Sequence, residues 1–238
     1  MLGTIINTCT IIVGTIVGAV LHRGVSEKYR RVLYDGLGLA SIAIGLNAAI
    51  SHMQESQSPV LFILAIALGG VVGTALDLDG HFRALIGRRA AKRRPGESMG
   101  GKASASLADG LITAMLLYCV GPLSMLGPVV SAIQGDNTLL FTNATLDLVS
   151  AVVFASTYGI SMLVAAPVLF LWQGMFYAVA LLSSQAVSDA LMNELLIVGG
   201  LLIMGSGLSL LNLKDCKILN LLPSLLVPVL WFALKAIF

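Results

Sequence analysis

The residues best suited to chemistry lie in one apolar stretch, TNATLDLVSAVVFAST, of a chain of 238 residues. Asn143, Asp147 and Ser150 recur at i, i+4 and i+7, so they share one face of a helix, and Thr157 extends this face. A carboxylate on a membrane helix is expected to face the bundle interior or a water-filled cavity. As a functional residue, Asp147 is expected to hold a cation or carry a proton; the structural alternatives are capping of a helix N-terminus and a bond to a neighbouring helix.

Two Gly-Pro pairs interrupt the apolar segment before this stretch, Gly121-Pro122 and Gly127-Pro128. Proline removes a backbone donor, and glycine loosens the same turn. Backbone groups freed at membrane depth must meet protein or water. Ser124 lies between the two pairs. We expect a helix broken over 121–128, which either supplies ligands to a path or only bends the helix.

The remaining acidic residues near apolar segments have simpler interpretations. Asp77, Asp79 and His81 form the sequence DLDGH at the end of an apolar run, where loop capping is preferred to a metal site. Glu194 is expected at the start of a helix, where the helix dipole favours an acidic side chain.

No pattern in the chain indicates an enzyme. The three cysteines, Cys9, Cys119 and Cys216, form no CxxC or Cys/His spacing, so neither disulfides nor zinc are expected. Ser/His/Asp and Cys/His sets with plausible spacing are absent, as is a phosphate-binding loop. We therefore expect no catalytic residues, no metal and no cofactor.

Composition indicates a membrane protein. The chain is 57% hydrophobic and 11% charged, with a mean hydropathy of +0.94, whereas soluble domains have roughly 25% charged residues. A span needs about 20 apolar residues, so seven or eight spans fill the chain. We predict an all-α, polytopic membrane helix bundle, with residues 1–238 as a single integral membrane domain.

The apolar segments predict about eight spans. The fifth is short and polar, so seven spans plus a re-entrant segment is the alternative. The expected spans are 4–21, 33–50, 59–76, 108–133, 144–159, 162–182, 195–211 and 219–237.

The positive charges predict the orientation of the spans. All of the 14 Lys and Arg residues except Lys235 lie in three loops, at 22–31, 83–106 and 212–218. Basic loops face the cytoplasm, so both termini are expected outside, with 83–106 as a cytoplasmic basic loop. This topology, in the lipid bilayer, explains the basic clusters better than nucleic-acid binding does.

Glycine patterns suggest close helix packing and an internal repeat. Gly14 and Gly18 have the GxxxG spacing that lets helices approach closely. The spacing of Gly38 and Gly45 is echoed by Gly200 and Gly207 in a later span, which fits an inverted repeat as found in transporters. The oligomeric state stays open, with a homo-oligomer among the alternatives.

Several blocks resemble a known family. They are MLGTIINT, PVLFILAIALGGVVGTALDLDGHF, LLYCVGPLSMLGPVVSAIQGDNTLLFTNATLD, FASTYGISM and ELLIVGGLLIMGSGLSLLNLKD, and together they cover essentially the whole chain. These blocks resemble the bacterial YqgA/YdfK-type inner-membrane proteins, a family of unknown function often labelled as transport proteins. The resemblance implies a multi-pass protein of the bacterial inner membrane.

The sequence as a whole favours a transporter or channel-like protein for an unknown small solute or ion. The alternative is a non-transporting membrane scaffold or regulatory partner that uses the basic loop. In the first case the path would lie between the broken fourth span and the polar fifth span. It would be lined by Ser124, Asn143, Asp147, Ser150, Thr157 and the two Gly-Pro pairs.

Overall fold

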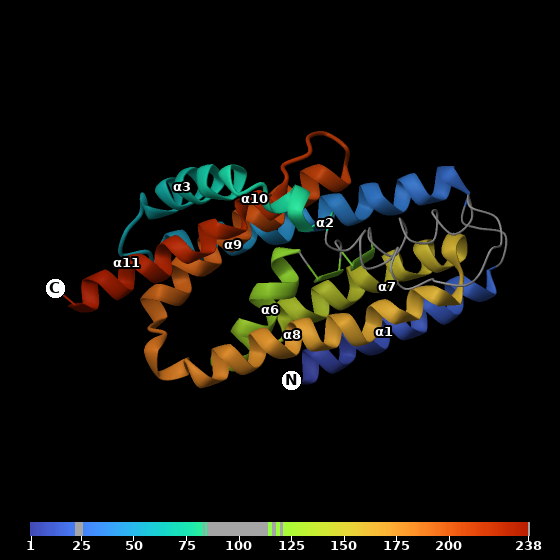
Figure 1. Ribbon diagram of the computed structural model, residues 1–238, viewed down its shortest axis with the longest axis horizontal. Helices are drawn as coiled ribbons and strands as arrows, with labels where there is room; N and C mark the ends of the chain where they lie inside the picture. Colours follow the sequence, from blue (N-terminus) through green and yellow to red (C-terminus); the bar gives the residue numbers. More distant parts are fainter. Residues whose placement is uncertain (22–25, 83, 85–113, 116–117, 120, 238) are drawn as a thin grey trace. The chain divides into compact units, whose positions relative to one another are not determined.

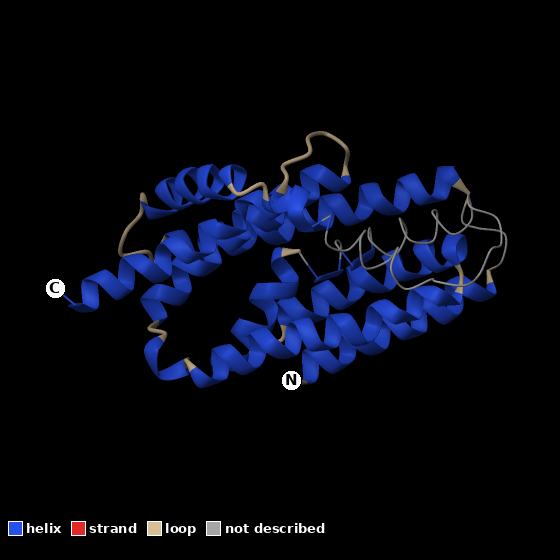
Figure 2. Cartoon of the chain, in the orientation of Figure 1, coloured by secondary structure: helices blue, strands red, loops and turns tan. Residues whose placement is uncertain are grey.

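The computed structural model describes residues 1–21, 26–82, 84, 114–115, 118–119 and 121–237. Every regular element in this part of the chain is a helix (Figure 2), so the predicted all-α class is confirmed. The chain divides into two compact units, residues 1–33 with 80–181 and residues 34–79 with 182–238. Neither unit is a continuous half of the sequence.

The helices fall into these units as follows, and Figure 1 labels the α-helices. The first contains α1 (Leu2–Val20), α6 (Pro122–Ile133), α7 (Thr138–Tyr158), the 3₁₀ helix η1 (Ile160–Val164) and α8 (Ala165–Leu182) up to residue 181. The second contains α2 (Glu27–Met53) from residue 34, α3 (Leu61–Ala75), η2 (Ser184–Ala186), α9 (Asp189–Leu210), α10 (Ile218–Leu221), η3 (Leu222–Leu225) and α11 (Leu226–Ile237).

Six stretches are long and apolar enough to cross a membrane, namely 2–20, 27–53, 138–158, 160–182, 189–210 and 218–235. α3 and α6 are apolar but shorter, with 15 and 12 residues. At a rise of about 1.5 Å per residue, α3 reaches about 22 Å, less than the roughly 30 Å of a hydrocarbon core. The polytopic helix bundle is confirmed. α3 and α6 lie within the third and fourth expected spans, and the first part of the fourth lies largely outside the described residues, so the count of eight stays a prediction.

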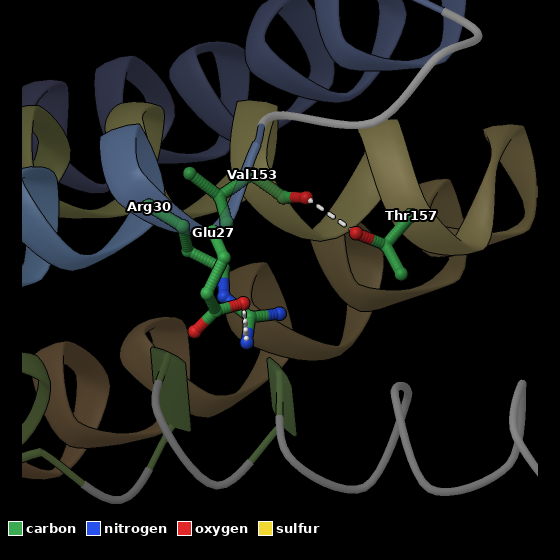
Figure 3. Close-up of polar contacts among 4 residues, drawn as sticks. All are labelled: Glu27, Arg30, Val153 and Thr157. Carbon is green, nitrogen blue, oxygen red and sulfur yellow. Dashed lines mark hydrogen bonds and ion pairs between the residues drawn. The ribbon is translucent and has the colours of Figure 1, made fainter.

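The loops differ from expectation at the start of α2. The predicted loop 22–31 is too long, because the helix begins at Glu27 and includes Lys28, Arg30 and Arg31. An exposed ion pair between Arg30 and Glu27, 2.7 Å apart, spans i and i+3 in this first turn (Figure 3) and favours the helix. The chain between α9 and α10 matches the loop expected at 212–218 to within one residue. The loop expected at 83–106 lies outside the described residues, apart from position 84.

The fifth expected span is longer than the sequence predicted. α7 begins at Thr138 rather than 144 and continues for 21 residues, between Gly135 and Gly159, which both have positive φ. Residues 138–143 are therefore helix and not loop. Because α7 is continuous and long enough to span, a re-entrant half-helix does not describe it.

α1 and α7 pack closely and run parallel. A carbon β on Gly14 would lie 2.7 Å from the carbonyl oxygen of Leu148, and one on Gly18 would lie 2.3 Å from that of Val152. Gly3 meets Leu140 in the same way near the start of both helices. Contact positions rise together along the two helices, so the helices are parallel. Only glycine permits this separation, as expected from the GxxxG spacing.

In the second unit, α2 and α9 meet through two pairs of facing glycines. A carbon β on Gly45 would lie 2.4 Å from the carbonyl oxygen of Gly200, and one on Gly200 would lie 2.6 Å from that of Gly45. Gly38 and Gly207 form the second pair. One number rises as the other falls, so these helices are antiparallel. The glycine spacing shared by the two helices is therefore explained by the contacts between α2 and α9. The inverted repeat stays a prediction.

α3 packs against the break between α10 and α11. A carbon β on Gly73 would lie 1.9 Å from the carbonyl oxygen of Asn220, and one on Gly69 would lie 2.3 Å from the backbone of Ser224. The contact positions rise along residues 220–224 as they fall along α3, so α3 and this segment are also antiparallel. The eighth expected span is interrupted here, because the 3₁₀ segment η3, which contains Pro223, separates α10 from α11.

Substituting a packed glycine is predicted to destabilise the fold. Gly45→Val places a side chain against the backbone of α9, whereas Gly36→Val in the same helix meets nothing within 4 Å. Both changes add the same β-branched residue to α2, so the difference reports packing. We expect Gly45→Val to lower the free energy of unfolding by about 1–3 kcal/mol more than Gly36→Val. Unfolding in mixed detergent, followed by circular dichroism, measures this difference, and equal stabilities would contradict the packing.

Candidate functional site

The polar face of α7 is buried in the first unit. Asn143, Asp147 and Ser150 are 5%, 3% and 2% exposed. The side-chain amide of Asn143 donates a hydrogen bond from Nδ2 to Oδ2 of Asp147 at 2.9 Å. The structure thus brings two of the sequence-predicted site residues into direct contact, one helical turn apart.

α1 supplies the opposite side of this site, which we call the α1–α7 seam: Thr4, Asn7 and Thr15 with Asn143 and Asp147. The three α1 residues are fully buried, and the side chain of Asn7 lies near the carboxylate of Asp147. Nδ2 of Asn7 nevertheless completes no hydrogen bond, and the hydroxyls of Thr4 and Thr15 have no partner either. The seam therefore contains buried polar atoms that have no hydrogen-bond partner within it.

The distribution of polarity in α1 is the reverse of that in a soluble helix. Its exposed side chains include Ile5, Val13 and Val17, which suit contact with lipid. Its buried side chains include Thr4 and Asn7. Sequence reasoning missed these residues because α1 was assigned to packing alone. The available signal was that Thr4, Asn7 and Thr15 recur on the face that carries the GxxxG glycines.

Asp147 has no positively charged partner among the described residues. The ion pair within the described part of the chain is the one between Arg30 and Glu27, at the start of α2. The thiol of Cys119 is buried and lies close enough for the charge of Asp147 to act on it. The neighbouring Tyr118 packs edge-on against Phe154 of α7, with ring centroids 6.3 Å apart. Asp147 is thus enclosed by α1, α7 and the segment before α6.

Ser124 belongs to a second buried polar contact. Nε2 of Gln173, on α8, donates to Oγ of Ser124 at 3.1 Å, and both side chains are fully buried. Oε1 of Gln173 has no hydrogen-bond partner. Gln173 was not predicted from the sequence, because a single glutamine in an apolar run carries no periodic signal.

The two Gly-Pro pairs have different surroundings. α6 begins at Pro122, and Gly121 is its extended N-cap, where the missing proline N–H needs no helical partner. Gly127 and Pro128 lie inside α6, which continues through them. Gly127 accommodates Leu140 of α7, which would lie 3.0 Å from a carbon β at that position.

Ser150 and Thr157 do not point their hydroxyls to a partner across a helix interface. Oγ of Ser150 donates to the carbonyl oxygen of Leu146 at 2.9 Å. Oγ1 of Thr157 donates to the carbonyl oxygen of Val153 at 3.4 Å, as Figure 3 shows, and Thr157 is exposed. The structure therefore brings Asn143 and Asp147 together, leaves Ser150 and Thr157 in bonds within α7, and places Ser124 in a separate contact with Gln173.

The turn before α7 fixes the seam at one end. Oδ1 of Asn137 accepts hydrogen bonds from the backbone N–H of Gly3 at 3.3 Å and from Oγ of Ser131 at 2.8 Å. Its Nδ2 donates to the carbonyl oxygen of Gly135 at 3.2 Å. One side chain thereby joins the start of α1 to the end of α6.

The structure places the acidic residues of the second unit in two different environments. Asp77 adopts a left-handed turn, with φ of 43°, after α3, and the N–H of Asp79 donates to Oδ1 of Asn220 at 2.9 Å. Across the described residues no three His, Cys, Asp or Glu side chains gather. Glu194, expected at a helix start, is instead the sixth residue of α9 and is fully buried.

Comparison with known proteins identifies relatives along nearly the whole chain. The family model described as "Protein of unknown function (DUF554)" matches residues 2–233. The chain is 43% identical over 228 residues to the uncharacterized membrane protein YdfK of Bacillus subtilis (strain 168), covering 96% of this chain and 94% of that protein. It is 25% identical over 246 residues to the uncharacterized protein YqgA of Escherichia coli (strain K12), covering 98% and 100%. No solved structure matches the chain. The predicted resemblance is confirmed.

Asn137→Ala is predicted to destabilise the first unit. The change removes three hydrogen bonds and leaves the N–H of Gly3 and the hydroxyl of Ser131 without this acceptor. We expect a loss of about 1–2 kcal/mol in the free energy of unfolding. Thr145→Ala is the control, because that exposed hydroxyl bonds only its own helix. Equal stability of the two variants in detergent would contradict the joining role of Asn137.

Asp136 gives this turn a predicted pH dependence. The hydroxyl and then the backbone N–H of Thr138 stabilise its carboxylate and lower its pKa from the usual value near 3.8. A lowered folded-state pKa stabilises the protein above the unfolded-state pKa, and this stability is lost as pH falls through the folded-state pKa. The difference in the free energy of unfolding between wild type and Asp136→Asn, measured by thermal unfolding at each pH, should therefore be constant above about pH 5 and shrink below pH 4. Because Asp136 is exposed, the difference should stay below about 1 kcal/mol. A difference that grows on acidification would contradict the assignment.

Proposed function

The chain belongs to the DUF554 family of proteins of unknown function, and we propose that it is a transporter or channel-like protein for a small solute or ion. The proposed path runs along the α1–α7 seam. The membrane location of the relative in Bacillus subtilis and the six long apolar helical stretches support a membrane role. The bacterial inner membrane is the compartment we propose.

The observation that carries the proposal is the buried carboxylate of Asp147. An isolated charge in an apolar interior is very unfavourable, and in practice such a group is paired or neutralised. Asp147 has two amide neighbours, Asn143 and Asn7, and no cationic side chain beside it within the described structure. Membrane proteins that retain such residues commonly use them in ion pathways or proton relays. A cation or proton is therefore the charge that Asp147 would accept.

The unused polar atoms of α1 support the same proposal. The hydroxyls of Thr4 and Thr15 and Nδ2 of Asn7 are buried without a hydrogen-bond partner. Buried polar groups are rarely left unpaired, and each exception calls for an explanation such as a water or an ion. A partly hydrated solute moving along the seam would supply these missing partners.

The helix directions are consistent with the proposed alternation of spans. In an eight-span chain the first and fifth spans run the same way, whereas the second and seventh run in opposite directions. α1 and α7 are parallel, while α2 and α9 are antiparallel, as this alternation requires. With basic loops facing the cytoplasm, we propose that both termini lie outside.

The second candidate function is a non-transporting scaffold or regulatory partner. It is favoured by the close contact of α1 with α7, where carbon β atoms on Gly14 and Gly18 would meet backbone carbonyl oxygens. A seam that stays this tightly packed leaves little space for a solute. In that case Asp147 would serve only to bond α1 to α7.

The two candidates are separated by the effect of Asp147→Asn on flux. We expect purified protein in liposomes to move a proton, Na⁺ or K⁺, monitored with an internal pH dye and with radioactive ²²Na⁺ and ⁸⁶Rb⁺. Asp147→Asn keeps the size of the side chain and should reduce flux at least tenfold. Asp136→Asn removes an exposed carboxylate outside the seam and should leave flux within about twofold of wild type.

Wild-type flux in Asp147→Asn would remove this residue from the mechanism. If wild-type protein moves none of the three cations, the cation path fails. The scaffold is then tested by deletion of residues 88–94, which should abolish binding of a partner in the scaffold case and leave the folded membrane domain intact.

A further inference from the structure

Glu194 is a fully buried carboxylate that the proposed path does not use. It lies in α9, in the second unit, and is not needed to begin that helix. Ser188 is the N-cap, and its Oγ accepts a hydrogen bond from the N–H of Leu191 at 3.2 Å. Asp189 already supplies an acidic side chain in the first turn. Initiation of α9 therefore does not explain why Glu194 is buried.

The carboxylate of Glu194 is only half satisfied. Its Oε1 accepts a hydrogen bond from Oγ of Ser56 at 2.5 Å, and Ser56 belongs to the connection between α2 and α3. The hydroxyl of Ser56 is itself held in place by the N–H of Ser58 at 3.1 Å. Oε2 of Glu194 is buried and has no partner. The carboxylate therefore keeps one oxygen, Oε2, that could contact a further ligand.

The charges around Glu194 are negative or neutral. His52 in α2 directs Nδ1 to the carbonyl oxygen of Ala48 at 2.8 Å and makes no ion pair. Oε2 of Glu55 accepts from Nδ2 of Asn193, the residue before Glu194, at 3.4 Å. The connections 54–60 and 183–188 contain no Lys or Arg. Glu55, Asp189 and Glu194 thus make this end of α9 acidic, which raises the local concentration of cations.

We propose that Glu194 and Ser56 form a binding site for a monovalent metal cation, Na⁺ or K⁺. The cation would contact Oε2 of Glu194 and the oxygen of Ser56, and it would neutralise the buried charge. A proton is the competing way to neutralise the carboxylate, and it would leave the protein without a response to Na⁺ or K⁺ in the test below. A divalent ion fits less well than a monovalent one, because such ions are usually held by several carboxylate or carbonyl oxygens. No cluster of three acidic, His or Cys side chains occurs in the part of the chain described.

This site is independent of the proposed path. Asp147 belongs to the first unit and Glu194 to the second. A cation bound at Glu194 would also link the connection between α2 and α3 to α9, because Ser56 and Glu194 come from these two elements. The bound cation would thus lie between the connection 54–60 and α9, within the second unit.

The test is cation binding by the full chain in lipid nanodiscs. Binding of ²²Na⁺ and the unfolding temperature are measured as NaCl or KCl replaces choline chloride at constant ionic strength. Wild type should show saturable binding and a rise in unfolding temperature with one of the two metal cations. Glu194→Gln keeps the size of the side chain and should weaken binding at least tenfold. Ser56→Ala should weaken it severalfold, and Glu55→Gln, which removes an exposed charge, should weaken it less than Ser56→Ala.

Asp136→Asn, which removes an exposed carboxylate of the first unit, should retain the cation response. The binding measured with Asp147→Asn reports any cation held in the seam, so that a failed flux assay and a failed binding assay remain distinguishable. The proposal is overturned if wild type responds to Na⁺ and K⁺ no differently from choline. It is equally overturned if Glu194→Gln keeps the wild-type response, or if the response disappears in Asp147→Asn and persists in Glu194→Gln.

Discussion

The close approach of α1 and α7 is the constraint on which the candidate site depends. At Gly14 and Gly18 a side chain would collide with the carbonyl oxygens of Leu148 and Val152. Without these glycines the helices would separate, and the buried polar side chains of α1 and α7 would lie farther apart. Tight packing at one end of the interface therefore holds polar groups together in its middle. In lipid, where association depends on packing and not on the hydrophobic effect, small residues are the usual means of achieving this.

The second unit uses the same means for a different pair of helices. Gly45 and Gly200 face each other across α2 and α9, and Gly69 and Gly73 admit the backbone of the interrupted helix after residue 218. Each unit also buries one carboxylate that has an amide or hydroxyl neighbour and no cationic partner among the described residues, Asp147 in the first and Glu194 in the second. Buried groups of this kind are costly to keep, so a functional explanation is preferred to a purely structural one for both.

Composition and hydropathy were sufficient to predict the helical class and the polytopic bundle, because a membrane permits few ways to satisfy the backbone. Helical periodicity was sufficient to pair Asn143 with Asp147, since both lie on one helix. The partners from other helices could not be predicted in this way: Asn7 and Gln173 are isolated polar residues in apolar runs, and their neighbours depend on how the helices pack. The start of α7 was missed because the bonds of Asp136 and Asn137 allow the helix to begin directly after the turn. Glu194 was expected at the start of a helix because the sequence did not reveal that α9 already begins at Asp189.

The central claim is that the α1–α7 seam admits water and ions, and thiol accessibility tests it most directly. In a background without Cys9, Cys119 and Cys216, single cysteines replace Thr4, Asn7, Asn143 or, as a control in the apolar interior, Leu169. The protein in sealed liposomes is treated with a small cationic thiosulfonate, and labelling is measured by mass. The account predicts that the seam cysteines react in the folded protein and that the cysteine at position 169 does not. Seam cysteines that are as unreactive as the one at position 169, in protein of wild-type stability, would show a dry interface and contradict the account.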